Sequence, residues 1–341
     1  MGLHESRQCG PDQRKAFAVT TTDPRADLVT RKTSFEVPDE GEVQSVRGRG
    51  PFVSSVQWRQ PDGGTATWDS REARKRGYIE VLVDGVVQRI RTRPATAIRL
   101  IRVNAVAGLS FAVGGALFTL GAMLAQWSTA SATTIDLVFL CGGFFFSTGG
   151  YTSIVQEINS PRSVDADGSL AETRWRWWAY EPMRPGWVSA FVLFVGTLAF
   201  AISLVDVFLS SLSTKQQDHL IWAPEMIGCV LFLVSGHVAI EEICHGRFRL
   251  MPRLLGWWVV SVNQLGSILF FLSGLAAYVR PATDEVINSD LMNWGTGLGA
   301  LCFSVAGVAQ LFERPESPAK RPDAAPAGGP RGRPAGPREA A

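Results

Sequence analysis

The sequence has few of the residues from which catalytic and metal sites are usually built. Four histidines and five cysteines occur among its 341 residues, and no pair of cysteines has the C-x-x-C spacing of a zinc or redox site. The P-loop, the His-Glu-x-x-His metalloprotease motif, the Gly-x-Ser-x-Gly elbow and the dinucleotide-binding glycine pattern are also missing. We therefore expect no metal, no cofactor and a non-enzymatic function.

A cleavable signal peptide and a strong net charge are absent too. Residues 1–52 contain no apolar core of the signal-peptide type, so the first apolar segment is expected to act as an uncleaved targeting element. The net charge is +2, from 33 basic and 31 acidic residues, and we expect no nucleic-acid partner. Arginine outnumbers lysine 28 to 5, a ratio typical of proteins from GC-rich bacterial genomes.

Long apolar segments, in contrast, are plentiful. Six windows of about 23 residues are long enough to cross a bilayer core of roughly 30 Å as helices. They cover residues 104–126, 135–157, 187–209, 221–243, 257–279 and 291–313. The sequence therefore predicts an all-α integral membrane protein with six transmembrane helices.

The basic residues near these segments are distributed unequally. Seventeen lie before the first segment, in the second and fourth connections, or within about twenty residues after the last segment, whereas the other three connections hold two. Cytoplasmic loops carry the excess of Arg and Lys in membrane proteins. Both termini are therefore expected to be cytoplasmic, in a bacterial inner membrane.

A pattern of glycine and phenylalanine recurs along the apolar segments. The full pattern, Gly-x3-Phe-x3-Gly, occurs three times, and a shorter Gly-x3-Phe precedes each copy. The members are Gly142, Phe146 and Gly150; Gly228, Phe232 and Gly236; Gly299, Phe303 and Gly307; and, before them, Gly114 and Phe118, Gly196 and Phe200, and Gly266 and Phe270. Residues four apart share a helix face, and stripes of small residues favour close helix packing in lipid. We predict three tandem two-helix hairpins, residues 94–158, 187–245 and 246–313, that pack through these residues.

The regions outside the hairpins differ from them in composition. Residues 1–51 and 314–341 lack apolar periodicity and are expected to be disordered. The loop 159–186 is charged and rich in tryptophan, and its aromatic residues are expected at the cytoplasmic membrane interface.

Residues 52–93 predict a small cytoplasmic α+β segment. Two β-hairpin signals flank a short basic helix, Arg71 to Arg76, which Asp69 or Ser70 caps and Gly77 ends. We interpret this segment as a structural collar; a regulatory or lipid-sensing module is the alternative.

Polar residues near the ends of the segments are the candidate functional residues. Gln156, Glu242 and Glu313 each follow the last glycine of the pattern by six positions. In a closed bundle they can form a polar ring at the cytoplasmic mouth, as cation pathways often do. They can equally pair with arginines in a structural ionic belt. The arginines considered for that belt are Arg247, Arg249 and Arg314.

A second polar group lies on the fourth segment. His237, Glu241 and His245 are spaced by four, which places them on one helix face, where imidazole and carboxylate can bind a metal or transfer protons. The favoured interpretation is that they are interfacial residues satisfied by water, arginines and lipid headgroups.

The chain resembles bacterial membrane proteins with YrhK-like domains, in which a Gly/Phe-rich two-helix hairpin is the unit. The resemblance covers residues 52–313. It is carried by this pattern, by the segment Arg176-Trp177-Trp178-Ala179-Tyr180-Glu181-Pro182 leading to Gly186-Trp187, and by Trp58-Arg59-Gln60-Pro61-Asp62-Gly63 continuing to Trp68-Asp69-Ser70-Arg71. Ala105 stands where the later copies have Trp187 and Trp257. The resemblance implies the architecture and no mechanism.

These patterns predict a non-enzymatic membrane scaffold or an interaction module. Its expected partners are membrane lipids, with anionic headgroups at the cytoplasmic face, and a second copy or another membrane protein. The alternative function is a small transporter or channel for protons or cations.

Overall fold

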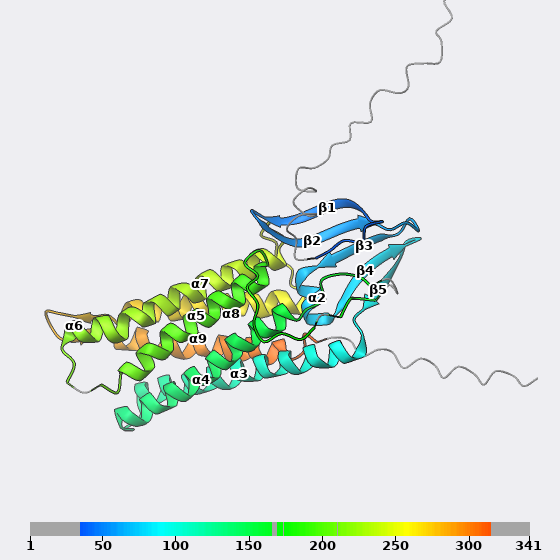
Figure 1. Cartoon of the computed structure of the whole chain (residues 1–341). Helices are drawn as coiled ribbons and strands as arrows, with labels where there is room; N and C mark the ends of the chain where they lie inside the picture. The colour runs from blue at the N-terminus through cyan, green and yellow to red at the C-terminus, as the bar shows by residue number, and fades with distance from the viewer. Residues whose placement is uncertain (1–34, 166–168, 173, 210, 315–341) are drawn as a thin grey trace, which may run out of the picture.

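The computed structural model describes residues 35–165, 169–172, 174–209 and 211–314. It consists of a bundle of long helices and a β-sheet that sits at one end of the bundle, with the short helix α2 (Ser70–Arg76) between them (Figure 1). We call this end of the bundle the sheet end. The disorder expected for residues 1–34 and 315–341 lies outside the described residues.

The sheet is a five-stranded antiparallel meander in which the strands lie in chain order. The strands are β1 (Glu42–Arg49), β2 (Phe52–Arg59), β3 (Thr65–Asp69), β4 (Tyr78–Val83) and β5 (Val86–Arg91). Both β-hairpins predicted for residues 52–93 are present, as β2–β3 and β4–β5. Alternate residues of β3 are buried, so that Ala66 and Trp68 face the core of the sheet domain.

The strand β1 corrects the expectation that residues 1–51 are disordered. Its two valines stand among polar and charged residues, which is why its sequence carries little strand signal. It is ordered because β2 supplies its backbone partners, with Val46 opposite Val56. Phe35, which lies in the same range, is fully buried between Trp58 and Trp68, with ring centroids 5.5 and 5.2 Å away.

The short basic helix has the ends that its sequence predicts. The carboxylate of Asp69 accepts a hydrogen bond of 2.9 Å from the backbone N–H of Glu72, which makes Asp69 the N-cap. Gly77 ends the helix with a φ of 67°, a left-handed conformation that glycine adopts without a steric penalty.

Among the described residues, six helices are long and apolar enough to cross a membrane. They are α3 (Pro94–Trp127), α4 (Ala132–Ile158), α5 (Pro185–Asp206), α7 (Ala223–Ile243), α8 (Leu255–Ala276) and α9 (Ser289–Gln310). The span that ends with α7 begins at Thr214, because α6 (Thr214–Gln217) and the π-helical turn η1 (Asp218–Trp222) run into it. A small hairpin of β6 (Val279–Arg280) and β7 (Glu285–Val286) connects α8 to α9. The helix α3 begins ten residues before its predicted window.

The helices form a closed ring in which each packs against the next along the chain, and α9 packs back against α3. The phenylalanines of the glycine pattern meet inside this ring. Phe118, Phe146, Phe200, Phe232, Phe270 and Phe303 belong to one buried cluster, and their rings contact one another at centroid distances of 5.1 to 6.4 Å.

Glycines make room for these rings. In the pair α3–α4, a Cβ at Gly114 would lie 2.9 Å from Phe146, and one at Gly142 would lie 2.6 Å from Phe118. The pair α5–α7 repeats this exchange with Gly196 and Gly228, and the pair α8–α9 brings Gly266 and Gly299 together. In α3–α4 and α5–α7 these contacts place each ring against a glycine of the partner helix, and in α8–α9 they do so for Phe303 against Gly266.

The last glycine of each stripe contacts the following helix instead. A Cβ at Gly150 would lie 3.1 Å from the Cα of Phe194 on α5, and one at Gly307 would lie 2.7 Å from the backbone of Gly108 on α3. Gly236 faces the side chain of Gln264 on α8. One stripe therefore serves two interfaces of the ring.

The substitution Gly228→Ala is expected to lower the free energy of unfolding by about 1–3 kcal/mol, the usual cost of overpacking a core. The added Cβ would lie 2.5 Å from Phe200 and 3.1 Å from the carbonyl oxygen of Gly196. Thermal and denaturant unfolding in detergent measure the change. Gly297→Ala is the matched control, because its Cβ would meet only the Cβ of Ala122, at 3.4 Å. Equal losses in the two variants would contradict this account.

Candidate functional site

The helix α2 presents three basic side chains to the sheet end of the bundle. Arg71, Arg74 and Lys75 have the i, i+3, i+4 spacing that places side chains on one helix face. The three residues are only 7, 6 and 6% exposed. Since a buried charge is costly without a partner, their contacts determine whether α2 can occupy this place.

Each of these cations contacts a polar residue at the end of a different helix pair, and Arg74 also contacts a second pair through Glu157. Arg71 donates to both carboxylate oxygens of Glu313, at 3.3 and 2.7 Å. Arg74 donates to both oxygens of Glu242, at 2.9 and 3.0 Å. Lys75 donates to the amide oxygen of Gln156 at 2.7 Å. The two-point contacts of the arginines are the strong, oriented form of this interaction.

The polar residues predicted at the helix ends therefore come together, but with partners that the sequence analysis did not identify. Gln156, Glu242 and Glu313 are buried against α2 and do not form an open ring. The carboxylates pair with Arg71 and Arg74, not with the three arginines proposed for the ionic belt. The local signal for this arrangement is the spacing of the basic residues in α2, which puts Arg71, Arg74 and Lys75 on one side of a helix.

Glycines at the starts of two helices leave space for the ion pairs. A Cβ at Gly186, in the first turn of α5, would overlap Arg74 Nη1 and Glu157 Oε1. A Cβ at Gly256, in the first turn of α8, would lie 2.8 Å from Arg71 Nε and would overlap Glu313 Oε1. Gly186 and Gly256, each of which is followed by a tryptophan, therefore allow the carboxylates and guanidinium groups to lie close to the helix backbone.

On α3 the corresponding position is Asn104, which stands ten residues before Gly114 as Gly186 stands before Gly196. Its amide oxygen accepts from Lys75 Nζ at 2.8 Å. Its amide nitrogen donates to the backbone oxygens of Gln310 and Glu313, each at 2.9 Å. Lys75 is therefore held by two neutral amides, whereas the arginines are held by carboxylates.

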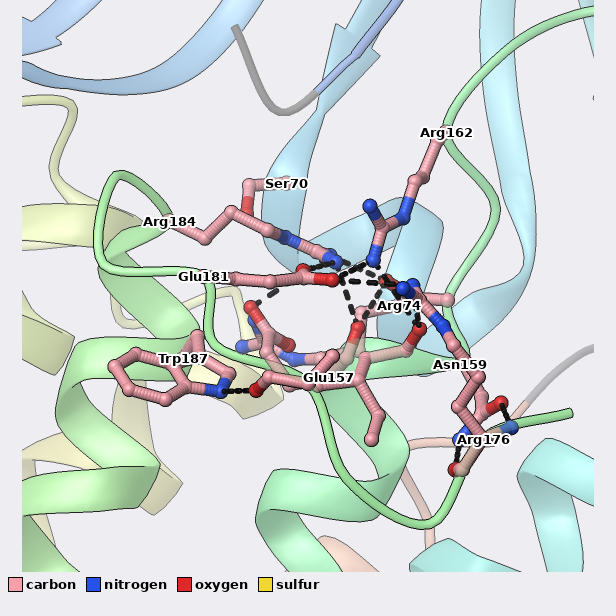
Figure 2. Close-up of polar contacts among 12 residues, drawn as sticks. Ser70, Arg74, Glu157, Asn159, Arg162, Arg176, Glu181, Arg184 and Trp187 are labelled. Carbon is pink, nitrogen blue, oxygen red and sulfur yellow. Dashed lines mark hydrogen bonds and ion pairs between the residues drawn. The ribbon is translucent and has the colours of Figure 1, made fainter. Parts of the chain in front are cut away.

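A fourth buried cation extends the cluster into the loop between α4 and α5 (Figure 2). Arg184 lies 3.8 Å from the carboxylate of Glu157 and donates to Glu181 at 2.9 Å. Glu157 also accepts from Arg74 at 2.6 Å. Glu181 also forms ion pairs with two further arginines of the loop, Arg162 and Arg176. Glu157 thus links α2 to the loop.

The same loop is fastened by neutral hydrogen bonds. The side chain of Asn159 accepts from the backbone N–H of Arg176 at 2.8 Å and donates to its carbonyl oxygen at 2.6 Å (Figure 2). Trp187 is 2% exposed and donates to the carbonyl oxygen of Ala179 at 3.0 Å. Trp177 and Trp178 are exposed. Trp187 is thus part of the packed structure, whereas Trp177 and Trp178 lie on the surface.

Burial and charge act differently on the two kinds of cation. The pKa of Lys75 is lowered to about 7, mainly by burial and in part by the nearby Arg74 and Arg71, against the opposing effects of Glu313 and Glu157. Burial would also lower the pKa of Arg74, but Glu157 and Glu242 outweigh it and hold the pKa above the ordinary value. Lys75 is therefore the basic group of α2 that changes its charge near neutral pH.

The second predicted polar group is divided by the structure. His237 and Glu241 lie 3.5 Å apart on α7, and Arg49 of β1 also pairs with Glu241. His245 does not share their face, because α7 ends at Ile243 and His245 has a φ of 52°. His245 lies between Ser54 and Asp69, at 2.9 and 3.1 Å. Within the described ranges, no three His, Cys, Asp or Glu residues are grouped closely enough to hold a metal ion.

A cavity of about 100 Å³ lies between α2 and the phenylalanine rings. Its lining includes Lys75, Gln156 and Glu242 from the ion cluster and Phe232 and Phe303 from the ring cluster. Polar groups from the helices also line it: Ser153, Ser189, Ser235, Ser267 and Asn263. A space of this size with several polar groups in its wall can hold ordered water.

The six apolar helices and the buried ion cluster at their end define a multipass α-helical membrane protein with an N-terminal sheet domain attached to the bundle. Comparison of the chain with protein-family models, with curated proteins and with solved structures finds no match.

The substitution Arg74→Met is expected to lower the free energy of unfolding by about 3–5 kcal/mol, since it leaves buried carboxylates without their partner. Denaturant unfolding in detergent measures this loss. Arg76→Met is the control on the same helix: Arg76 is more exposed and pairs with Glu72 at 3.3 Å, so its removal should cost less than about 1 kcal/mol. Similar losses for both variants would show that the buried cluster does not hold α2.

The docking of α2 is expected to strengthen as the pH rises from about 7, the pKa of docked Lys75, towards 10.5, its ordinary value. Over this interval the undocked lysine carries a proton that the docked lysine has lost, which gives a slope of up to about 1.4 kcal/mol per pH unit. Below pH 7 both forms are charged, and this contribution becomes constant.

Thiol labelling of a cysteine that replaces Ala190, a buried residue lining the cavity under α2, reports the docking. Lys75→Met in the same background is the control, and its protection from labelling should not change with pH beyond the intrinsic reactivity of the thiol. A pH dependence shared by both proteins would exclude Lys75 as its source.

Proposed function

We propose that the chain is a non-enzymatic scaffold of the bacterial inner membrane, which holds its N-terminal sheet domain at the cytoplasmic face for binding to lipids and partner proteins. The observation that carries this proposal is the binding of α2 to three helix pairs through Arg71, Arg74 and Lys75. A domain that is fixed to a bundle by buried ion pairs presents its outer surface in one defined position.

The proposal includes three tandem two-helix repeats, of the kind that YrhK-like domains contain. It is supported by the recurrence of the same contact in each pair: a glycine on one helix faces its partner helix, and a phenylalanine one turn later enters the shared core. It is supported further by the polar residue that ends each pair, since Gln156, Glu242 and Glu313 all bind α2. We assign the repeats an approximate threefold arrangement about the axis of the bundle.

The orientation rests on the distribution of basic residues. The connections rich in arginine belong to the sheet end, where Arg247, Arg249 and Arg253 are exposed. Exposed aromatic residues of the same end, Trp177, Trp178 and Tyr180, suit the interface between headgroups and acyl chains. The sheet end is therefore assigned to the cytoplasm, with anionic headgroups around it.

A transporter or channel for protons or cations is the second candidate, and one observation favours it. The cavity beneath α2 is lined by serine hydroxyls and by Asn263, at the depth where a pathway would need polar groups. Against it, the phenylalanine rings occupy the centre of the ring of helices, and α2 covers its sheet end. A pathway would require both to move.

Reconstitution in liposomes separates the two functions. The intact protein is expected to give no flux of protons, Na⁺ or K⁺ above that of empty liposomes. Glu242→Gln combined with Glu313→Gln removes the two carboxylates that hold the arginines of α2, and Arg280→Gln, at the other end of the bundle, is the control. Flux through the intact protein that the double substitution abolishes would overturn the scaffold proposal.

A further inference from the structure

A groove of about 260 Å³ lies where the turn between β1 and β2 meets the helices α5 and α7. Its lining includes Arg49, Phe52, Pro185, His237, Val238 and Glu241. Phe52, Pro185 and Val238 border the groove with apolar side chains from three elements. Arg49, His237 and Glu241 form a small polar group at one side of it. It lies at the sheet end, where the helices give way to the sheet domain.

The polar group is accessible and already oriented. The side chains of Arg49 and His237 are each 65% exposed, and both contact the carboxylate of Glu241. A guanidinium group has five N–H donors, so the contact with Glu241 leaves donors on Arg49 available. By holding these two side chains, Glu241 reduces the entropy that they would lose on binding an anionic oxygen.

An apolar strip leads along α7 into this groove. Ile227, Val230 and Val234 are exposed, and their spacing of three and four residues places them on one face of the helix. The same face continues to His237 and Val238 at the groove. A chain of methylene groups lying on the strip would therefore reach the polar group with its end.

The loop after α7 adds positive charge nearby. Gly246 lies against the backbone of Gly48, and a Cβ on it would be 3.1 Å from Arg49 Cβ. Arg247 and Arg249 follow directly and are exposed. Arg49, Arg247 and Arg249 thus place three positive charges at or near the groove, against the carboxylates of Glu241 and Glu242 in its lining, of which Glu242 is paired with Arg74.

We propose that this groove binds one phospholipid of the bilayer, with the phosphate at Arg49 and His237 and an acyl chain along Ile227, Val230 and Val234. The proposal rests on the membrane placement given under the proposed function. It names one lipid site on the molecule and the chemistry that recognises it, namely a phosphodiester next to an apolar chain.

Native mass spectrometry of the full chain in detergent tests the site. The protein is incubated with phosphatidylglycerol, with phosphatidylethanolamine or with a diacylglycerol of the same chains. We expect one molecule of either phospholipid to be retained and the diacylglycerol to be lost. Arg49→Gln should lower retention about fivefold, the equivalent of about 1 kcal/mol for one basic residue near the membrane surface. His237→Gln should lower it as well, and Arg280→Gln should leave it unchanged.

Three results would overturn the proposal: full retention in both groove variants, equal retention of the diacylglycerol, or displacement of the lipid by glycerol phosphate alone. Labelling of cysteines at Thr129 and Arg249 by a membrane-impermeant reagent tests the placement separately. If the two cysteines are labelled from opposite sides of the membrane and both Arg49→Gln and His237→Gln retain the lipid, the lipid site alone is rejected. Labelling from the same side would reject the placement itself.

Discussion

The structure depends on the requirement that a charge removed from water must meet an opposite charge or a set of hydrogen bonds. Transferring an ion to a protein interior costs several kcal/mol, and α2 buries three cations at the sheet end of the bundle. Their partners lie far from α2 along the chain, as Glu313 shows, which is 242 residues from Arg71. The sheet domain and the helices are therefore assembled as one unit, since neither part satisfies these groups alone.

The interior of the bundle follows a different rule. Helices in lipid gain little from burying apolar surface against one another, so cohesion has to come from close contact. The exchange of Gly114 and Phe146 with Gly142 and Phe118 provides this contact in a form that a chain can repeat. The ionic contacts lie at one end of the bundle and the ring contacts in its centre, and a cavity remains between them. Lys75 belongs to the ion cluster and also lines this cavity.

Local patterns predicted much of this arrangement. Helix length, apolar windows, the two β-hairpins of residues 52–93 and the caps of α2 are all encoded by neighbouring residues. The strand β1 was missed because its order comes from β2, and the placement of His245 was wrong because α7 stops two residues earlier. The polar helix ends were identified, but their partners were not, since no spacing along the chain connects Glu313 to Arg71.

The amides that receive Lys75 have one more effect. Glu242 and Glu313 offer carboxylates to Arg74 and Arg71, whereas Asn104 and Gln156, from α3 and α4, offer amides to Lys75. Glu157 of α4 is a second carboxylate partner of Arg74. An arginine placed against the amides would lack a counter-charge, and moving Lys75 elsewhere would deprive a carboxylate of its fork-shaped partner. The three basic side chains of α2 are therefore matched to different acceptors, which fixes the orientation of α2 on the end of the bundle.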